Sequence, residues 1–556
     1  MHSQWSSSQL SNETLETPNP LWGKVHARFI EYIDMDSAQI SKRWQYLGLC
    51  CIVLIGLAAR VKPMQIPQLD RTMWKEIDYI EISRNYAAHG MHFLEPEITW
   101  PAEPPRITAM EFPAVPYAAA ALYKALGFQV GAVRLIPLMA FLIMPVYLFF
   151  LVRDEMAPLP ALTTSLVATL MPIHHPFGLV LFSEPVSITM SVAALFHFNR
   201  WAKYGQFRHA VGAMLALTLA VAVKLEPLFM LLPLAYLWWR YRRAGRTTVF
   251  FPLFVAASLT LPLSWFLYAY HLSRTSIDVF GIVPFLRGHN KLQTLTLTRD
   301  YHFWLTLGHR IWTLGWGLLG LPFQAIGLIV AMQEKRARLF LVYSVTIAIY
   351  FVIVAEGQLD APYRQLNAVP VLSFFTAVGI LALISVLFDR MKLSSERNIK
   401  LLIAITVAVV LIAFLPSYWE TLREDPNEPS HPRTWALAQQ IRSHSVAGDC
   451  LVALGEYTAH EGGNDVSPVL YYYSGRQGWT LSEDQLSEQR LDALIRKHAT
   501  LLAVDDEFVF SRGIRNEHTR VFIENLTKKF PILYRSGDAL LLRLSPSPAI
   551  AGTLGS

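Results

Sequence analysis

Residues 46–63 read YLGLCCIVLIGLAARVKP, an apolar run that follows the basic residues Lys42 and Arg43. An α-helix needs about 20 predominantly apolar residues to cross the hydrocarbon core of a bilayer. Lys and Arg beside a span mark its cytoplasmic side. We therefore interpret this run as an uncleaved signal anchor. Residues 1–45 are then a cytoplasmic N-terminus, which is predicted to be partly disordered because residues 1–20 are polar.

The composition indicates that most of the chain lies in a membrane. Of the 556 residues, 53% are hydrophobic and only 16% are charged, whereas about a quarter are charged in a typical soluble domain. These values exclude a disordered chain, a fibrous repeat and an ordinary soluble enzyme. A net charge of +6 is typical of cytoplasmic Lys and Arg in a membrane protein rather than of nucleic-acid binding. The 3 cysteines form neither a disulfide framework nor a Cys/His metal motif.

Further apolar runs extend the membrane part to residue 417, and basic residues follow every second run, as expected for cytoplasmic connections. The run 113–127 is short, and counting it as a span would move the basic clusters to the outside. We interpret it as an interfacial helix within an external loop, 64–131. The sequence therefore predicts an α-helical polytopic membrane protein with about 11 transmembrane helices over residues 46–417. The predicted spans are 46–63, 132–152, 159–173, 180–198, 209–223, 225–239, 247–270, 305–332, 339–356, 365–388 and 401–417.

From residue 418 the composition becomes that of a soluble protein. Helix-like stretches alternate there with strand-like ones, which predicts a small extracytoplasmic α/β domain over residues 418–556. It contains no glycine-rich phosphate loop, nucleophile elbow or metal motif, so acceptor docking, a lid or a structural cap are its expected roles. The expected helices are 433–445, 484–497 and 516–529, and the expected strands are 450–455, 500–504 and 539–544.

The external loop contains the stretch WKEIDYIEISRNYAAHG, residues 74–90. Its apolar residues recur at helical spacing and Gly90 suits a helix end, which predicts a helix at the membrane surface. Glu76 and Asp78 fall near its start, where the helix dipole favours an ionised carboxylate. Such a carboxylate can act as a general base at neutral pH. The alternative is that both acids are helix caps.

Charged residues in other segments are predicted at the same outer face. Glu111 precedes the interfacial helix, and Glu184 lies at the outer end of an apolar run, where a carboxylate is costly unless it has a partner. Lys224 lies between two apolar runs, and Tyr363 and Arg364 stand in a short external turn. Lys and Arg recognise phosphate, although Arg364 is equally an interfacial anchor. Acids and cations on one membrane face suit an amphiphilic substrate with a phosphate headgroup.

Several of these residues have structural alternatives. Lys224 stands close to Glu226 and either pairs with it or extends toward water. Glu81 and Arg84 have the i,i+3 spacing of a helical ion pair. The adjacent residues His174-His175 are expected at the membrane interface, because neighbours in sequence do not share the helical face that a metal would need.

Taken in order along the chain, these segments resemble the GT-C superfamily of membrane glycosyltransferases, which use polyprenyl-phosphate-linked sugars. The resemblance is to bacterial relatives of protein O-mannosyltransferases and of lipid A aminoarabinose transferase. It covers residues 46–417 and extends weakly into the tail at 470–479. The segments that carry it are Glu76–Tyr86, Glu111-Phe112-Pro113, Ser183-Glu184-Pro185, Val223-Lys224 and Tyr363-Arg364.

The sequence departs from this pattern at two positions. Relatives often have two adjacent acids in the first loop, but Ile77 separates Glu76 from Asp78 here, so either acid can hold the family's position. The aminoarabinose-type family has a lysine after the second-loop glutamate, where this chain has Phe112. This difference argues against aminoarabinose transfer.

The resemblance implies a hexosyl- or pentosyltransferase that acts at the extracytoplasmic face of a bacterial plasma membrane. Asp78 or Glu76 would take the proton from an acceptor hydroxyl, which attacks the anomeric carbon with inversion. Lys224 and Arg364 would stabilise the departing lipid phosphate. The remaining substrate-binding candidates are Arg84, Glu111, Glu184 and Tyr363.

The resemblance also implies the partners. These are a polyprenyl-phosphate sugar donor, a glycan, lipid or protein acceptor, and membrane lipid, with no nucleic acid. The resemblance identifies no definite cofactor, and a divalent cation held by Glu111 or Glu184 is the one option. Two other functions fit the composition. A transporter or flippase of lipid-linked sugars often shows inverted repeats, which are not seen here. A scaffold would leave the acids of the first loop without a role.

Overall fold

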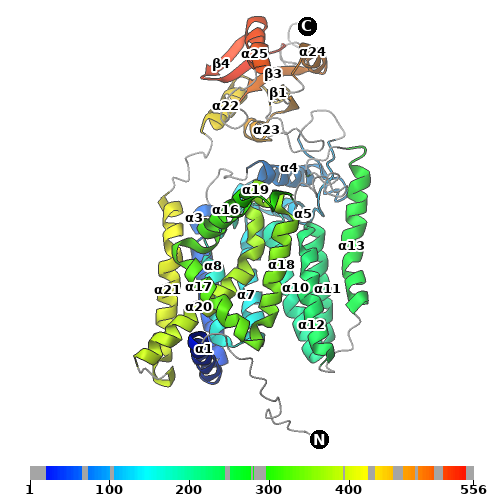
Figure 1. Cartoon of the computed structure of the whole chain (residues 1–556). Coiled ribbons are helices and arrows are strands. Elements are labelled where there is room, and N and C mark those ends of the chain that lie inside the picture. Colours follow the sequence, from blue (N-terminus) through cyan, green and yellow to red (C-terminus); the bar gives the residue numbers. More distant parts are fainter. Residues whose placement is uncertain are drawn as a thin grey trace.

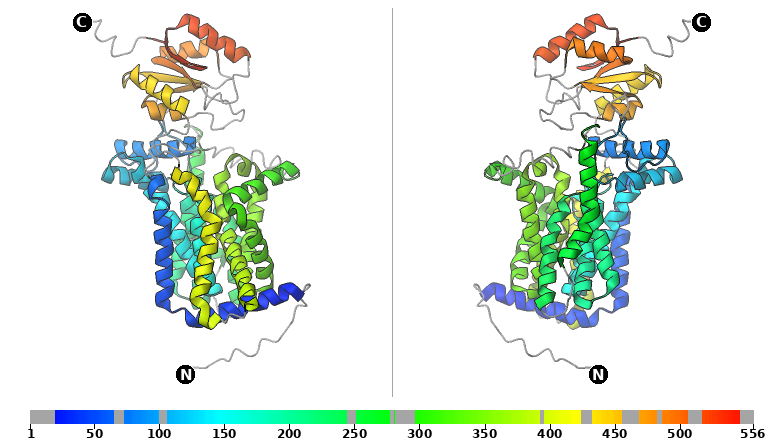
Figure 2. Two further views of the ribbon diagram at one scale, coloured as in Figure 1. Left: turned by 90° about the vertical axis from the view of Figure 1, so that its left-hand side faces the viewer. Right: turned by 90° about the vertical axis from the view of Figure 1, so that its right-hand side faces the viewer.

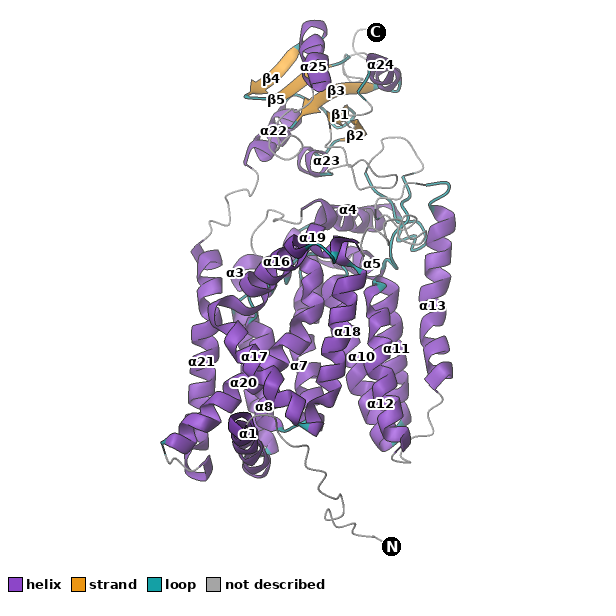
Figure 3. Ribbon diagram, viewed as in Figure 1, coloured by secondary structure: helices purple, strands orange, loops and turns teal. Residues whose placement is uncertain are grey.

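The computed structural model consists of a helical bundle with a small mixed domain at one end (Figure 1). We call this end of the bundle the outer end. The strands lie in the small domain (Figure 3). This mostly helical fold with a C-terminal sheet is the fold class that the sequence predicts. The structure describes residues 20–64, 73–99, 106–243, 251–276, 280, 296–391, 395–423, 432–454, 468–481, 486–505 and 517–545.

The helical part is built from elements that follow one another along the chain. The first half comprises α1 (Pro20–Gln39), α2 (Lys42–Ala58), α3 (Val61–Met64), α4 (Met73–His89), α5 (Ala114–Leu126), α6 (Val130–Val133), α7 (Leu135–Glu155), α8 (Pro158–Leu170), α9 (His174–Phe177), α10 (Glu184–Tyr204) and α11 (Phe207–Val223). The second half comprises η1 (Glu226–Met230), α12 (Leu231–Arg243), α13 (Phe251–Leu272), α16 (Tyr301–Arg310), η2 (Ile311–Trp316), α17 (Gly317–Gln333), η3 (Lys335–Ala337), α18 (Arg338–Ile353), α19 (Ala355–Asp360), η4 (Pro362–Ala368), α20 (Val369–Arg390) and α21 (Ser395–Arg423).

The length and apolar character of several helices suit a bilayer. Among the described residues, 4 helical stretches are long and apolar enough to cross one: Val130–Glu155, Phe251–Leu272, Lys335–Ile353 and Pro362–Arg390. Shorter apolar helices are Pro158–Leu170, Phe207–Val223, Gly320–Gln333 and Lys400–Phe414. The total of about 11 transmembrane helices remains a prediction.

Several predicted spans are divided between helical elements in the structure. The run 225–239 is shared between the 3₁₀ helix η1 and α12. Its first turn contains Pro227, which lacks a backbone donor and so weakens a continuous helix. The run 305–332 is shared between α16, the π-helical turn η2 and α17. Figure 2 shows α16 lying obliquely at the outer end of the bundle.

Glycine allows two helices of the bundle to cross in close contact. A side chain at Gly327 of α17 would clash with the carbonyl oxygen of Phe375, and one at Gly379 of α20 would clash with that of Phe323. Small residues at a helix crossing let backbones approach, which is how helices associate in lipid. The pairing of α17 with α20 therefore depends on these two glycines.

Two helices lie across the outer end of the bundle. α4 and α5 pack side by side there (Figure 2). Their apolar residues share a core with Leu181 of the bundle and Val469 of the small domain. The orientation of α5 agrees with the interfacial helix expected at 113–127. At the opposite end, α1 lies across the bundle and packs against α8 and α20 (Figure 2); the sequence analysis did not predict this helix.

The small domain is a mixed sheet with helices. Its strands have the order β2-β1-β3-β5-β4, and β1 pairs in parallel with β2 and β3, whereas β5 pairs antiparallel with β3 and β4. The six expected elements are all present, and α23, β2 and β4 were not predicted. The elements are α22 (Pro432–Ser443), β1 (Cys450–Leu454), α23 (Val469–Ser474), β2 (Gln477–Leu481), α24 (Glu488–Arg496), β3 (Ala499–Val504), α25 (Glu517–Lys529), β4 (Ile532–Ser536) and β5 (Ala539–Arg543).

Candidate active site

The helix α4 is enclosed between the bundle and the small domain. Every residue from Lys75 to Ser83 is buried, although this segment carries four charged side chains. From the small domain, α23 packs against α4, and the guanidinium of Arg84 lies 5.2 Å from the ring of Tyr472 and 5.8 Å from that of Phe128. Arg84 thus contacts two aromatic rings. It attracts the carboxylate of Glu81 electrostatically but does not form the close ion pair that the spacing predicts.

A buried network of ion pairs lies beneath α4. The Nζ atom of Lys224 is 2.9 Å from Oε1 of Glu111 and 3.2 Å from Oε1 of Glu184. The Nζ atom of Lys75 is 3.0 Å from the same oxygen of Glu184. Two lysines therefore balance two carboxylates, as buried charges require. The partners of Lys224 are these two acids and not Glu226, whose influence is only electrostatic.

Hydroxyl groups join this network to α4 and to the turn before α20. The Tyr79 hydroxyl is 2.5 Å from Oγ of Ser183 and donates to Oε2 of Glu111 at 3.5 Å. The Tyr363 hydroxyl accepts from Nζ of Lys75 at 3.5 Å. Arg364, the next residue, acts electrostatically on Lys224, and its buried Nε atom has no hydrogen-bond partner among the described residues. The structure thus brings together segments that are far apart in the sequence.

The two candidate bases of α4 have different surroundings. Glu76 lies in the first turn, where its Oε1 atom accepts from the backbone N–H of Leu181 at 3.2 Å and is 3.8 Å from Nε of Arg134. Asp78 lies two residues further along, is fully buried, and neither of its carboxylate oxygens has a hydrogen-bond partner in the described part of the chain. The contacts of Glu76 therefore fix the position of α4, whereas the carboxyl group of Asp78 makes no hydrogen bond within the described residues.

Burial changes the protonation of Asp78. Loss of solvation raises the pKa of Asp78 well above its usual value, the charge of Glu81 raises it further, and Lys75 partly opposes them. This shift is opposite to the expectation that the helix dipole favours an ionised carboxylate at Asp78. The helix dipole acts within the first turn, and Asp78 lies beyond that turn. Loss of solvation is therefore the largest influence on its pKa.

Glu81 provides a test of this burial. Desolvation raises the pKa of Glu81 from 4.5 to about 7, and hydrogen bonds from Thr99 oppose this rise only in part. Because the folded state holds this proton more tightly than the unfolded state, the stability is greatest below about pH 4.5 and falls as the pH rises through 7. We expect Glu81→Gln to leave the unfolding free energy unchanged at pH 4.5 and to raise it by about 3 kcal/mol at pH 8. Thermal unfolding of both proteins across this range measures the difference, and equal pH dependence would contradict it.

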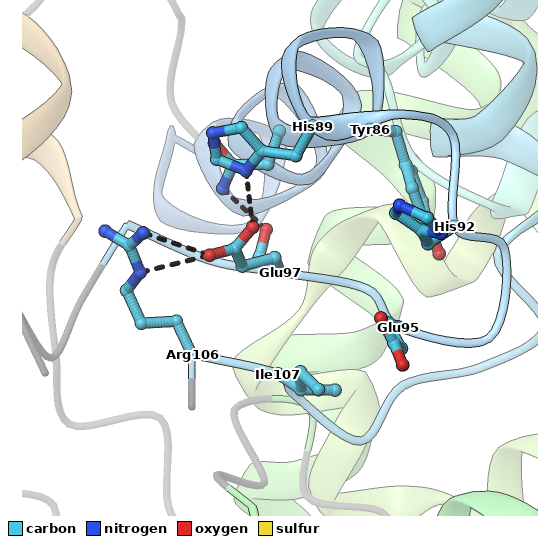
Figure 4. A pocket seen from close by; sticks show the side chains of 8 residues that line it. Tyr86, His89, His92, Glu95, Glu97, Arg106 and Ile107 are labelled. Atoms are coloured by element: carbon cyan, nitrogen blue, oxygen red, sulfur yellow. Dashed lines mark hydrogen bonds and ion pairs between the residues drawn. The ribbon is translucent and has the colours of Figure 1, made fainter. Parts of the chain in front are cut away.

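A polar pocket of about 380 Å³ opens at the C-terminal end of α4 (Figure 4). Nδ1 of His89 lies 2.6 Å from Oε2 of Glu97, and Nη2 of Arg106 lies 3.0 Å from Oε1. The chain turns at Gly90, whose φ of 108° suits glycine, and the next N–H donates to the carbonyl of Tyr86 at 2.8 Å. The lining residues are Asn85, Tyr86, His89, His92, Glu95, Glu97, Arg106 and Ile107. The pocket presents donors and acceptors within one to two helical turns of the buried acids.

The acids that were considered as metal ligands do not suit a divalent cation. Glu111 and Glu184 already face the ammonium groups of Lys75 and Lys224, which supply two positive charges at the position that a cation would take. Within the described residues, no group of 3 or more His, Cys, Asp and Glu is arranged to hold a metal. No catalytic step is assigned to a metal here.

Some site residues were missed or misplaced by the sequence analysis. Lys75, Tyr79 and Ser183 belong to the network but were not singled out, although Lys75 stands directly beside a candidate acid. His174 is buried against the ring of Phe141 rather than at the interface. Phe112, at the position where the aminoarabinose-type family has a lysine, packs in an aromatic cluster with two other rings.

The fold of this chain, a helical bundle with a small domain at one end, is similar to that of two solved proteins. ArnT from Cupriavidus metallidurans is similar over nearly its whole length. Its apo crystal structure matches with a TM-score of 0.56 at 12% identity over 89% of this chain and 97% of that chain. Its crystal structure bound to undecaprenyl phosphate matches with a TM-score of 0.58 at 13% identity, over 91% of this chain and 99% of that chain.

A second solved structure has the same fold. The archaeal oligosaccharyltransferase AglB from Archaeoglobus fulgidus, in complex with an inhibitory peptide and a dolichol-phosphate, gives a TM-score of 0.55 at 11% identity over 84% of this chain and 70% of that chain. No protein-family model and no curated protein matches the sequence. The resemblance seen in the sequence is thus confirmed at the level of the fold.

Proposed function

We propose that this protein transfers a sugar from a polyprenyl-phosphate donor to an acceptor hydroxyl at the extracytoplasmic face of a bacterial plasma membrane. The observation that carries the proposal is the buried carboxyl group of Asp78, which has no hydrogen-bond partner among the described residues and lies beside the Lys75, Glu184, Lys224 and Glu111 network. Structures with this fold bind undecaprenyl phosphate and dolichol-phosphate, which supports a lipid phosphate as the carrier. Hexose and pentose donors are both compatible with this chemistry.

The residues of the site suit an inverting displacement. Asp78 takes the proton from the acceptor hydroxyl, whose oxygen attacks the anomeric carbon as the bond from that carbon to the lipid phosphate breaks. Because its pKa is raised, the carboxylate of Asp78 is a more effective proton acceptor once ionised. Glu76 is the weaker candidate, because it already accepts from the backbone of Leu181. A lipid phosphate leaves readily, so no carboxylic acid is needed to protonate it.

The cations of the network suit the charge that develops on the phosphate. Lys224 and Arg364 are the groups that we assign to this stabilisation, and the structure adds Lys75 to them. Fixed charges in a buried site stabilise such a transition state more strongly than they would in water. Glu111, Glu184 and Tyr363 hold the two lysines in position.

The polar pocket at the end of α4 is assigned to the acceptor. Its helical lining residues lie 7–11 residues beyond Asp78, or about 10–16 Å along the helix. Arg84, between the pocket and the acids, is held by aromatic rings of α23 and of the segment after α5. In this arrangement the small domain covers the acceptor side of the site.

The proposal is tested with purified full-length protein in lipid nanodiscs. A panel of radiolabelled polyprenyl-phosphate hexoses and pentoses is incubated with a bacterial envelope extract, and labelled product and free polyprenyl phosphate are measured. We expect release of the lipid phosphate from one donor in proportion to the labelled acceptor. Movement of an intact donor across proteoliposome membranes without cleavage would contradict a transferase and indicate a transporter.

A further inference from the structure

A second charged cavity lies at the end of the bundle opposite α4. It has a volume of about 750 Å³ and is lined by residues of α2, α7, α10 and α11. α7 begins next to Arg134, which contacts Glu76 of α4, and reaches Arg153 about 28 Å further along its axis. The cavity is therefore remote from the proposed site of sugar transfer, and nothing in that reaction uses it.

Positive charge exceeds negative charge at the rim of this cavity. Arg200 binds Asp154 with two hydrogen bonds, at 2.7 and 3.2 Å, and Arg153 is 3.5 Å from the same carboxylate. Within the described residues, the guanidinium of Arg208 donates only to the neutral side chain of Gln206, with hydrogen bonds of 3.2 and 3.1 Å. Among the described residues, the three guanidinium groups thus have one carboxylate, Asp154, which contacts only Arg200 and Arg153. A fork of Arg donors that lacks a carboxylate partner is suited to a phosphate.

The lining becomes apolar away from this rim. Ile143 and Val146 line the cavity on α7, about 15 and 10 Å along the helix from Arg153, and Phe150 lies between them and the arginines. Large aromatic side chains are exposed close to the rim in sequence: Trp44 is 64% exposed and Phe207 is 78% exposed. Exposed aromatic residues of this kind mark the interface between lipid and water. The cavity therefore spans the depth from headgroups to acyl chains.

We propose that this cavity binds an anionic phospholipid, with the phosphate at Arg153, Arg200 and Arg208 and an acyl chain along Ile143 and Val146 of α7. The change from basic to apolar lining favours a lipid over a soluble phosphate, because a soluble anion has no group to place on the apolar wall. Basic pockets between membrane helices are known to bind such headgroups. This inference is independent of the proposed sugar transfer.

Native mass spectrometry of the full-length protein in detergent tests the inference by titration with phosphatidylglycerol and with phosphatidylcholine. We expect wild type to retain phosphatidylglycerol preferentially. Arg208→Gln should weaken its binding about fivefold, and Arg153→Gln/Arg208→Gln about thirtyfold. Arg208 is exposed, so the single variant is expected to fold normally. The matched control is Arg242→Gln/Arg243→Gln at the end of α12, which removes the same charge and should change binding less than threefold.

Three results would overturn the inference. Equal retention of both lipids by wild type would show that the headgroup charge is not recognised. An equal loss in the α12 control would show a general effect of surface charge. Displacement of phosphatidylglycerol by an equal concentration of glycerol 3-phosphate would identify a soluble phosphate as the ligand. Failure of the sugar-transfer assay would leave these outcomes unaffected.

Discussion

Replacing Asp78 with asparagine is expected to lower the rate of sugar transfer by about 10²- to 10⁴-fold, the usual contribution of a general base. Asparagine has nearly the same shape but cannot accept the proton. Burial raises the pKa of Asp78, and neither carboxyl oxygen has a hydrogen-bond partner among the described residues, so the amide breaks no ion pair there. The thermal midpoint should stay the same or rise. Single-turnover transfer and thermal unfolding, measured on the same preparations, check both expectations.

Glu76→Gln is the matched control on the same helix. Glu76 accepts from the backbone of Leu181 and lies near Arg134, so its amide variant should lose about 1–3 kcal/mol of stability and keep most of its activity per folded molecule. The opposite pattern, with normal transfer in Asp78→Asn and loss of transfer in a stable Glu76→Gln, would move the base to Glu76. Loss of activity with loss of fold in both variants would contradict a catalytic role for either.

Replacing Lys224 with methionine is expected to destabilise the protein by about 3–5 kcal/mol and to abolish measurable transfer. Burial alone would raise the pKa of Glu111, but Lys224 and Lys75 outweigh it and lower that pKa below the usual value. Removal of Lys224 leaves Glu111 buried without its closest cation, and an uncompensated buried charge carries a penalty of this size. Equilibrium unfolding in mixed micelles gives the stability.

A second substitution separates stability from function. Lys224→Met/Glu111→Gln removes both charges and should recover most of the lost stability, while transfer stays low because the phosphate has lost a cation. Lys124→Met, at the exposed end of α5 on the same outer end, should change stability by less than about 0.5 kcal/mol. If the double variant regains transfer together with stability, Lys224 is structural and does not act on the phosphate.

Much of the architecture was predictable because it depends on local pattern. Apolar runs and helical spacing placed α4, α5 and six elements of the small domain within a few residues of their observed bounds. The π-helical break before α17 and the helix α1 were not predicted. Their polar and apolar residues do not differ enough from those of a loop or a continuous span to be distinguished by pattern alone.

The sequence by itself determined the class of protein, its membrane part, the acidic surface helix and the set of charged residues near it, because run length, spacing and charge can be read from neighbouring positions. Only the tertiary structure decided the partners within that set. Lys224 pairs with Glu111, 113 positions away, and Lys75 pairs with Glu184, 109 positions away. Within the part of the chain that the structure describes, Asp78 has no hydrogen-bond partner, although it stands two residues from Glu76, which has one. These side chains differ in partner and in pKa because they differ in burial and in their distance from other charges. Both quantities depend on how the whole chain folds and cannot be read from one position in the sequence.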